Sequence, residues 1–336
     1  MKIIVPMAGR GSRLRPHTLT IPKPLVPVGG KPIVHRLVED IAEVCSEPID
    51  EIAFIIGDFG DAVEKELIEV AAKLGAKGTI HYQKEPLGTA HAVLCAESAL
   101  EGPVVIAFAD TLFRADFKLD PTADGILWVN QIDDPSAFGV VKLDSEGNIT
   151  DFVEKPKEFV SDLAMIGIYY FKNGNRLKQE LKYLIDNNIM KGGEYQLPDA
   201  MRRLTESGVK LKSGTVSEWL DCGNKEVTVY TNQRVLEFDW EKNRNLVDDS
   251  IKTLNSCIIP PCYIAEGVVI ENSVVGPHVS IGKNCIISNS NLQNTIIQHG
   301  SLINSVVLSD SMIGSNVKLN GKKIDLSLGD YSVVDL

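Results

Sequence analysis

A glycine-rich stretch near the start of the chain carries the residue types that bind phosphate. After a short apolar run at 3–6, typical of a strand, come Ala8, Gly9, Gly11, Ser12 and Arg13. Glycines let a backbone turn sharply and approach a ligand closely. No acidic residue precedes Glu39, whereas seven cations do: Lys2, Arg10, Arg13, Arg15, Lys23, Lys31 and Arg36. In a chain with a net charge of -11, this local positive field predicts a site for a polyanionic ligand.

The Gly-x-Gly pattern alone is unspecific. It lacks the third glycine of the dinucleotide fingerprint and the Gly-Lys-Ser/Thr ending of the P-loop. A basic surface turn is the alternative, but it does not account for the prolines that fix the backbone around Lys23 and Lys31. The longer string is more informative: Gly9-x-Gly11-Ser12-Arg13-Leu14-x-Pro16-x-Thr18, then Pro22-Lys23-Pro24-Leu25-x-Pro27 and Gly30-Lys31-Pro32. This string resembles the signature of the sugar-1-phosphate nucleotidylyltransferases, which make nucleotide sugars from a nucleoside triphosphate and a sugar phosphate.

Two aspartates stand where a divalent cation could bind. Asp110 directly follows an apolar run at 104–109, and Asp221 lies between Trp219-Leu220 and Gly223. A carboxylate at a strand end can hold Mg²⁺ together with substrate phosphates, although an aspartate in a turn or helix cap is at least as frequent. The family resemblance implies that both aspartates bind the catalytic Mg²⁺.

The stretch at 82–89 resembles the part of the family that reads a pyrimidine base. Its candidate nucleotide-binding residues are Gln83, Gly88 and Thr89. A side-chain amide can pair with the carbonyl and imide edges of thymine or uracil. The first loop is one residue shorter than that of thymidylyltransferases, whereas the sequence at 88–92 is closer to uridylyltransferases. We therefore expect dTTP or UTP, with GTP or ATP as the alternative.

Three further segments resemble the sugar side of the family's site. Gly139 lies in a strand whose backbone would pass the sugar, and Glu154-Lys155-Pro156 resembles the family's Glu-Lys-Pro element. The resemblance implies that Glu154 accepts hydrogen bonds from sugar hydroxyls and that Lys155 meets the sugar's phosphate. Glu194 is the second residue of a stretch, from Gly193 to Asp199, that is similar to the family's Gly-Glu-x-x-x-Thr-Asp, but Pro198 stands where threonine is usual. The expected sugar substrate is a hexose 1-phosphate, with glucose 1-phosphate favoured.

Together these residues predict transfer of a nucleoside monophosphate. A phosphate oxygen of the sugar 1-phosphate would attack the α-phosphorus in line, and pyrophosphate would leave. Such a reaction requires positioning and charge neutralisation rather than a covalent nucleophile. Arg13 and Lys23 are the candidate catalytic residues, and the loop amides from Ala8 to Ser12 would cradle the triphosphate.

The elements that must position these residues alternate between strand and helix. Apolar strands are expected at 52–56, 79–83 and 104–108, and helices from 33, from Asp61 as a cap, and at 89–100. This alternation predicts an α/β domain with a Rossmann-like, mostly parallel sheet covered by helices on both faces. Ligands of such sheets bind at the carboxyl ends of the strands, where the first loop, the 83–89 loop and Asp110 emerge.

The period changes after residue 258. Apolar residues recur about every sixth position, in triplets: Ile258, Ile264, Ile270; Val275, Ile281, Ile287; Leu292, Ile297, Ile303; Leu308, Ile313, Leu319. Coils of 16 to 17 residues are typical of hexapeptide repeats and predict a short parallel β-helix. The resemblance to known hexapeptide domains implies that this β-helix is left-handed. The predicted organisation is a nucleotidyltransferase domain at 1–240, a linker at 241–255, the β-helix at 256–322 and a tail at 323–336.

Composition limits the other functions. The acidic balance argues against nonspecific nucleic-acid binding, and no apolar run is long enough for a membrane span. The six cysteines form no Cys-x-x-Cys pair, so we expect reduced thiols in a cytoplasmic enzyme of nucleotide-sugar and polysaccharide biosynthesis. The faces of a solenoid favour association, which predicts a homo-oligomer. Two alternatives are acyl transfer on the β-helix, with His278 or His299 as base, and a noncatalytic nucleotide-sugar sensor.

Overall fold

The computed structural model describes residues 1–9, 11–115 and 118–321. They divide into two compact units. The first comprises Met1–Pro27 and Lys31–Val227, and the second comprises Val28–Gly30 and the chain from Thr228 onward. The predicted tail at 323–336 lies outside the described residues.

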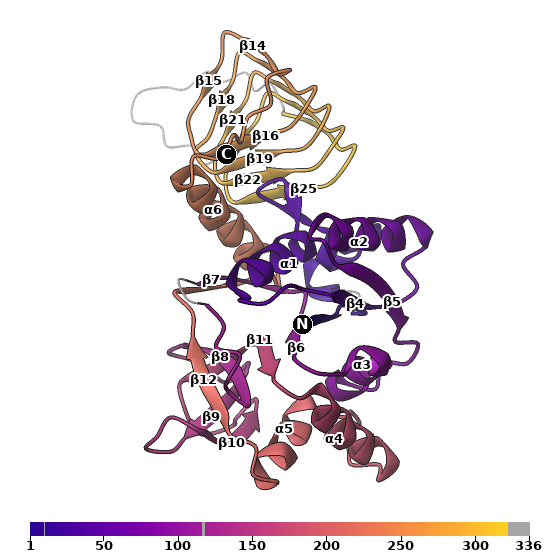
Figure 1. Ribbon diagram of the computed structural model, residues 1–336. Helices are drawn as coiled ribbons and strands as arrows, with labels where there is room; N and C mark the ends of the chain where they lie inside the picture. Colours follow the sequence, from indigo (N-terminus) through magenta and orange to yellow (C-terminus); the bar gives the residue numbers. More distant parts are fainter. Residues whose placement is uncertain (10, 116–117, 322–336) are drawn as a thin grey trace. The chain divides into compact units, whose positions relative to one another are not determined.

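The first unit is built on one large sheet with a parallel core (Figure 1). Its core strands are β1 (Lys2–Pro6), β4 (Glu51–Ile56), β5 (Lys77–Tyr82) and β6 (Val104–Ala107). They lie parallel in the order β6-β1-β4-β5, and Ile4 of β1 pairs with both Ala53 and Ile106. The apolar runs of β1, β4 and β6 are typical of strands that are buried on both faces. The predicted parallel-rich α/β fold is confirmed.

Beyond β6 the sheet continues with antiparallel pairings. The strands are β8 (Gly125–Gln131), β9 (Gly139–Leu143), β10 (Ile149–Glu154) and β11 (Leu163–Phe171), and β12 (Leu211–Thr215) adds to β8 in parallel. Strands β9 and β10 form a hairpin through the turn at 144–148, where Gly147 has a φ of 80°. The antiparallel extension therefore carries Gly139 and Glu154, two of the residues predicted to bind the sugar.

Helices cover this sheet. They are α1 (Ile33–Val44), α2 (Asp61–Lys73), α3 (Thr89–Cys95), α4 (Gly174–Asp186) and α5 (Leu197–Glu206). Residues of α3, α4 and α5 form one buried cluster with Ile4 and Ile106 of the sheet. Burial of this kind stabilises a fold by about 25 cal/mol per Å² of apolar surface removed from water.

Two helix boundaries differ from the sequence-based expectations. Gly60, at a φ of 83°, is the N-cap of α2, so Asp61 is the first helical residue and not the cap. An aspartate there still favours the helix because it lies at the positive end of the helix dipole. Helix α3 ends at Cys95, and a separate 3₁₀ turn, η4 (Glu97–Ala99), brings Ala99 and Leu100 into the core.

A pair of short strands adjoins the carboxyl end of β6. These are β7 (Thr111–Arg114) and β13 (Glu218–Asp221), which pair antiparallel with Thr111 opposite Asp221. The 3₁₀ turns η1 (Ser12–Leu14), η2 (His17–Leu19) and η3 (Lys23–Leu25) follow β1. Strands β2 (Pro27–Val28) and β3 (Lys31–Pro32) then pair before α1 begins.

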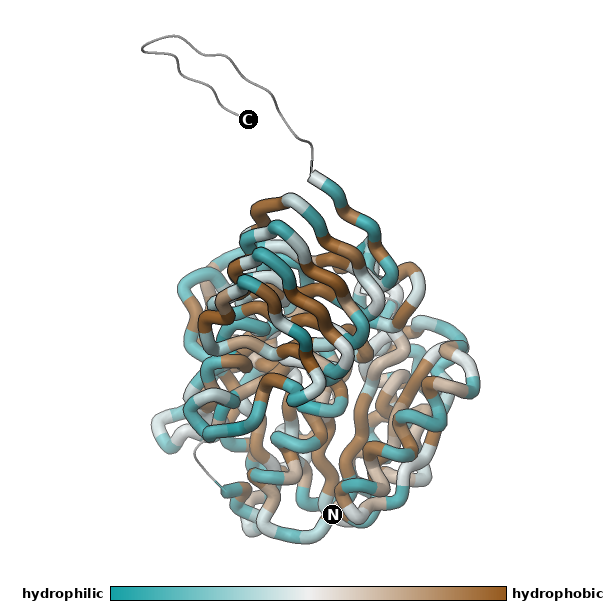
Figure 2. Tube along the Cα trace, turned by 90° about the horizontal axis from the view of Figure 1, so that it is seen from above, coloured by the Kyte–Doolittle hydropathy of each residue, from teal (hydrophilic) through white to brown (hydrophobic). Residues whose placement is uncertain are grey.

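The second unit contains α6 (Lys225–Glu241, mostly in this unit) and a stack of short parallel strands. Its three ladders are β14-β17-β20-β23-β26, β15-β18-β21-β24 and β16-β19-β22-β25. The first ladder contains Lys252–Leu254, Val269–Glu271, Ile286–Ser288, Leu302–Asn304 and Lys318–Asn320. The second contains Cys257–Ile258, Val274–Val275, Asn291–Leu292 and Val307–Leu308. The third contains Cys262–Ile264, Val279–Ile281, Thr295–Ile297 and Ser311–Ile313. Hydrophobic segments recur in each coil (Figure 2).

The register confirms the predicted repeat. Ile258 pairs with Val275, Val275 with Leu292 and Leu292 with Leu308. The other two columns of the triplets stack in the same way. The structure fits the predicted left-handed β-helix.

The boundary between the units differs from the predicted domain boundary at 240. Residues of α6 bond to the coils within the second unit: Asn232 accepts from Ser280 at 2.7 Å, and Glu237 lies 3.0 Å from His278. The predicted linker also contributes to the coils, because the Ile264 amide donates to the carbonyl of buried Leu246. Helix periodicity could not indicate which unit buries the helix.

All six cysteines are free thiols, and four of them are buried: Cys45, Cys222, Cys262 and Cys285. Burial raises the pKa of Cys45 to about 11, so this thiol stays protonated at neutral pH. In the described part of the chain, every helix is too short or too polar to span a membrane.

Candidate active site

The loop after β1 is held in shape by Gly11. This residue has a φ of 67°, and a Cβ on it would lie 2.5 Å from Cβ of Lys23. Only glycine meets both demands without strain. The Gly11 carbonyl accepts from the Leu14 amide at 3.0 Å and from Oγ1 of Thr18 at 2.8 Å. Arg10 lies outside the described residues, whereas Arg13 is exposed at the start of the loop's 3₁₀ turn.

Lys23 is a buried cation with a carboxylate partner. Pro22 and Pro24 flank it in η3, and its side chain is 8% exposed. Its Nζ lies 3.1 Å from Oδ2 of Asp110, which ends the β6 segment. A buried ammonium group requires such pairing because desolvation of a charge is costly. The ion pair joins two residues that are 87 positions apart.

Asp110 and Asp221 are brought together by β7 and β13. The Cys222 amide donates to the Asp110 carbonyl at 3.0 Å, and Asp221 pairs with Thr111. Burial raises the pKa of Asp221; Lys23 and Arg13 lower it, and the nearby charge of Asp110 raises it. The two carboxylates and the two cations therefore share one electrostatic environment.

This donor set fits Mg²⁺. Mg²⁺ prefers oxygen ligands and is usually bound by one or two carboxylates plus substrate phosphates. No group of three or more His, Cys, Asp and Glu side chains with metal-binding geometry occurs in residues 1–9, 11–115 and 118–321. With carboxylates only from Asp110 and Asp221, the further ligands of a Mg²⁺ ion here would be substrate phosphates or water.

The 83–89 loop is shaped by contacts with the start of α5. Nε2 of Gln83 donates to the Gly88 carbonyl at 3.1 Å and lies 3.2 Å from Nδ1 of His91. The Ala90 amide donates to the Tyr195 carbonyl, and the Leu197 amide donates to Oγ1 of Thr89 at 2.9 Å. Gln83 thus has one amide end engaged, and the loop presents its backbone at the carboxyl end of β5.

Of the residues predicted for the sugar, Gly139 and Glu154 lie on the β9–β10 hairpin and Lys155 directly follows it. Gly139 pairs directly with Glu154, and a Cβ on Gly139 would come within 2.8 Å of the Glu154 carboxylate. Lys155 follows with a φ of 45°, and its amide donates to the Phe138 carbonyl at 3.1 Å. Burial raises the pKa of Glu154, Lys155 lowers it and Glu194 raises it, which shows that the two glutamates are close enough to repel.

A cavity of about 480 Å³ joins most of the predicted residues. It is lined by Ala8, Gly9, Gly11, Ser12, Arg13, Lys23, Gln83, Gly88, Thr89, Asp110 and Glu194. Gly139, Glu154, Lys155 and Asp221 are not part of its lining, although Gly223 is. Burial raises the pKa of Tyr169, and the charges of Glu154 and Asp110 raise it further.

The structure adds residues that the sequence did not single out. Pro24, Pro86, Ala92 and Phe108 also line the cavity. A neighbouring hollow of about 830 Å³ shares Ala8, Gly9, Gln83 and Pro86 with it and extends to Phe59 and Tyr82. Phe108 could have been suggested from the sequence, because it is an apolar residue between a buried strand and Asp110. No sequence signal indicates Phe59.

The two histidines considered for acyl transfer lie in the second unit. Nε2 of His278 lies 3.0 Å from Oε1 of Glu237, and Nδ1 of His299 lies 3.1 Å from Oγ of Ser315. Both belong to turns of the coils. Neither belongs to the lining of the cavity described above.

A glycine loop and cationic side chains that line a cavity at the carboxyl edge of a parallel sheet are typical of nucleotide-binding α/β enzymes. The nucleotidyl transferase family model matches residues 2–237. The chain belongs to this family, and it is a sugar-1-phosphate nucleotidyltransferase.

Similar proteins agree with this assignment. The chain is 31% identical to a glucose-1-phosphate thymidylyltransferase of Streptomyces antibioticus, over 88% of this chain and 86% of the relative. It is also 31% identical to the low-salt glycan biosynthesis nucleotidyltransferase Agl11 of Haloferax volcanii, over 88% and 87% of the two chains. A crystal structure titled as a putative glucose-1-phosphate thymidylyltransferase of Bacillus anthracis superimposes with a TM-score of 0.58 at 25% identity, covering 69% of this chain and 93% of the other.

Proposed function

We propose that the enzyme transfers a nucleoside monophosphate from dTTP or UTP to glucose 1-phosphate, releasing pyrophosphate. The observation that carries the choice of base is the position of Gln83 in the cavity, where its amide faces the Gly88 backbone. A pyrimidine offers both a carbonyl and an imide N–H to such an amide and backbone pair. The thymidylyltransferase relatives support dTTP, and the 88–92 sequence supports UTP.

The residues of the cavity would divide the work as follows. Arg13 and the amides of Ala8, Gly9, Gly11 and Ser12 would bind the triphosphate and stabilise the charge that develops in the transition state. Lys23 would neutralise the phosphates from its buried position. Gln83, Gly88 and Thr89 would orient the base and ribose. A preorganised site of this kind lowers the barrier because its charges need no reorganisation during the reaction.

Gly139, Glu154, Lys155 and Glu194 would bind the hexose 1-phosphate. Glutamate oxygens accept hydrogen bonds from sugar hydroxyls, and the Lys155 ammonium would hold the phosphate for in-line attack. Enzymes of this family generally depend on Mg²⁺. Asp110 and Asp221 would hold that ion, which would supply charge neutralisation to the phosphates when bound.

A substrate panel tests this proposal. The purified enzyme is incubated with Mg²⁺, one of dTTP, UTP, ATP or GTP, and one of several hexose 1-phosphates, and pyrophosphate release is measured. We expect the fastest release with dTTP or UTP and glucose 1-phosphate. Faster release with ATP or GTP would overturn the choice of base, and faster release with another hexose would overturn the choice of sugar.

The coils also support the proposal of a homo-oligomer. Leu254, Ile286 and Leu302 lie on one ladder of the β-helix and are 57%, 43% and 37% exposed. Exposed apolar residues that follow one face favour association. Light scattering of the purified chain should give a multiple of 36.7 kDa; a mass of one chain at micromolar concentration would contradict it.

A further inference from the structure

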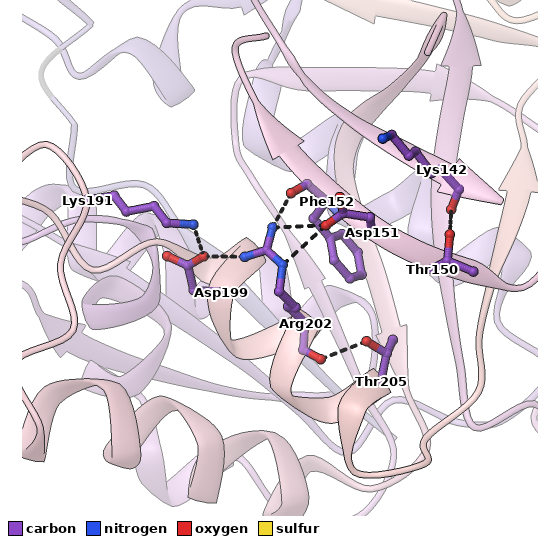
Figure 3. A network of polar contacts seen from close by, with 8 residues as sticks. All are labelled: Lys142, Thr150, Asp151, Phe152, Lys191, Asp199, Arg202 and Thr205. Carbon is purple, nitrogen blue, oxygen red and sulfur yellow. Dashed lines mark hydrogen bonds and ion pairs between the residues drawn. The ribbon is translucent and has the colours of Figure 1, made fainter. Parts of the chain in front are cut away.

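One buried carboxylate on α5 joins two separate segments of the first unit. Asp199 is 7% exposed, and its Oδ1 lies 2.5 Å from Nζ of Lys191 and 2.7 Å from Nη1 of Arg202 (Figure 3). Asp199 lies in the first turn of α5, where the helix dipole favours a carboxylate. Arg202 lies one turn further on, so the helix itself sets the spacing between the two side chains.

The Lys191 arm of this network reaches Glu194. Lys191 and Glu194 exchange two backbone hydrogen bonds, at 2.9 and 3.2 Å, across Gly192 and Gly193, whose φ values are 61° and 83°. Two successive positive φ angles are typical of a tight hairpin turn. Because the Lys191 side chain is tied to Asp199, the turn that ends at Glu194 is held against α5.

The Arg202 arm reaches the strand that carries Glu154. The guanidinium donates twice to Oδ1 of Asp151, at 3.2 Å each, and also to the Phe152 carbonyl (Figure 3). Glu154 ends this strand, β10, two residues later. Guanidinium groups hold several acceptors in a rigid planar fork, so Arg202 fixes the end of β10 against the same helix turn.

The two glutamates need such a restraint. Glu194 raises the pKa of Glu154, which places both carboxylates within electrostatic reach of each other. Like charges at this range repel and would widen the site if their segments could move freely. Sugar recognition depends on acceptor spacing, since each hydroxyl group must meet an oxygen at hydrogen-bond distance.

We infer that Asp199 is a positioning residue that acts through its partners Lys191 and Arg202 to set the spacing of Glu154 and Glu194, and that this spacing governs affinity for the hexose 1-phosphate. The inference rests on the proposed function, because it takes both glutamates as sugar ligands. It assigns no role to the network in binding of the nucleoside triphosphate. The effect of breaking it should therefore appear in one substrate and not in the other.

Three variants test the inference: Asp199→Asn, Lys191→Met and Arg203→Gln. Asp199→Asn removes the shared charge, and we expect the KM for the hexose 1-phosphate to rise by about tenfold, the usual effect of losing a charge-assisted hydrogen bond. Lys191→Met removes one partner whose side chain is 61% exposed, and a rise of about threefold is expected. The KM for the nucleoside triphosphate should stay within about twofold of the wild type in both.

Arg203→Gln is the matched control. Arg203 is the next residue of α5, but its Nε lies 2.6 Å from Oε2 of Glu180 and its guanidinium lies over the Tyr183 ring. Loss of the Arg203 guanidinium removes an ion pair on the α4 side of the helix. The KM for the hexose 1-phosphate and the KM for the nucleoside triphosphate should both stay unchanged. The double variant with Lys191→Met and Asp199→Asn should behave as Asp199→Asn alone, because both substitutions break one interaction.

Two outcomes would overturn the inference. One is an unchanged KM for the hexose 1-phosphate in a folded Asp199→Asn enzyme. The other is a parallel rise of both KM values, which a general loss of structure would cause. If Asp199→Asn does not fold, Lys191→Met decides alone, since its side chain is mostly in solvent. Wild-type enzyme that releases no pyrophosphate from any substrate pair would instead refute the proposed function and the inference with it.

Discussion

Lys23 shows how one residue can combine stability and chemistry. Its charge is buried, and the partner that stabilises it in the free enzyme is Asp110. In the proposed mechanism, Asp110 would turn to the cation and Lys23 to the phosphates when the triphosphate enters. The ion pair would hold both side chains in place until the substrate provides these partners.

Arg13 is expected to contribute to the transition state more than to the fold. Its side chain is exposed and lines the cavity. Arg13→Ala should lower turnover by about 10²-fold, the usual cost of one lost electrostatic contact to developing charge. Arg15→Ala is the control, because Arg15 is an equally exposed cation outside the cavity lining. Steady-state kinetics and thermal melts measure both variants. Near-normal turnover of Arg13→Ala would show that the loop is not catalytic.

We expect the Asp221 carboxylate to lower the stability of the metal-free enzyme at pH 7, although it serves the proposed metal site. Its pKa is raised, mainly by burial. At a pH between the ordinary and the raised pKa, the native state therefore holds a proton that the unfolded state has released. The stability of the native state therefore falls as pH rises from the ordinary carboxyl pKa through the raised one, and the ionised group is destabilising at pH 7. Asp221→Asn should melt at a temperature no lower than the wild type at pH 7 without Mg²⁺.

The same variant tests the proposed metal site. Added Mg²⁺ with nucleotide should raise the melting temperature of the wild type, because a ligand of the native state stabilises it. Asp221→Asn should lose most of this increase and most of its activity. A variant that melts lower than the wild type at pH 7, or that keeps the full Mg²⁺ response, would contradict these assignments.

At the scale of elements, the 83–89 loop depends on close backbone packing. Gly88 has a φ of 104°, and a Cβ there would lie 2.5 Å from the Tyr195 carbonyl oxygen and 2.8 Å from its amide nitrogen. Backbone atoms cannot move aside as a flexible side chain can. The glycine therefore allows the loop to lie directly against the segment that carries Glu194.

Gly88→Ala should lower stability and activity more than an alanine substitution at another glycine with similar backbone angles. Gly60 has a φ of 83° and ψ of 159°, close to the 104° and 178° of Gly88, but open space surrounds its Cβ position. Gly60→Ala should cost about 1–3 kcal/mol of stability from strain alone. Gly88→Ala should cost more and should also raise the KM for the nucleoside triphosphate. Chemical denaturation and kinetics compare the two, and equal effects would show that the packing at Tyr195 is unimportant.

At the scale of the whole molecule, the coils are stabilised by stacking neighbours. Each apolar column runs through successive coils, so a buried side chain contacts the coils on both sides of its own. The 16 to 17 residue period is therefore a packing requirement. Polar residues such as Glu271 and Lys318 occupy exposed strand positions beside the buried column.

Neighbouring residues on one strand of the β-helix test this requirement. Ile287 is fully buried in the apolar column, whereas Ile286 beside it is 43% exposed. Ile287→Ala should lower the free energy of unfolding of the coils by about 2–5 kcal/mol, the usual effect of a cavity in a core. Ile286→Ala should change it by less than about 0.5 kcal/mol. Urea unfolding followed by circular dichroism measures both, and similar losses would show that the column is not the core.

The classes of structure could be predicted from the amino-acid sequence alone. Periods of 3.6, 2 and about six residues are local properties of the chain, so the α/β pattern and the coils could be predicted from residue spacing. The cationic glycine loop, the aspartates and the Glu-Lys-Pro element likewise carry their chemistry in residue type. The cap of α2, the end of α3 and the unit that holds α6 were missed because long-range packing decides them.

The contacts between these residues could be seen only in the folded chain. Lys23 and Asp110 are 87 positions apart, and the β7–β13 pair that aligns Asp221 with Thr111 joins segments more distant still. The network of Lys191, Asp199 and Arg202 has no sequence signature, because ion pairs between exposed and buried groups depend on three-dimensional distance. Residue type specifies what a side chain can do, whereas the packing of distant segments determines the partner with which it does so.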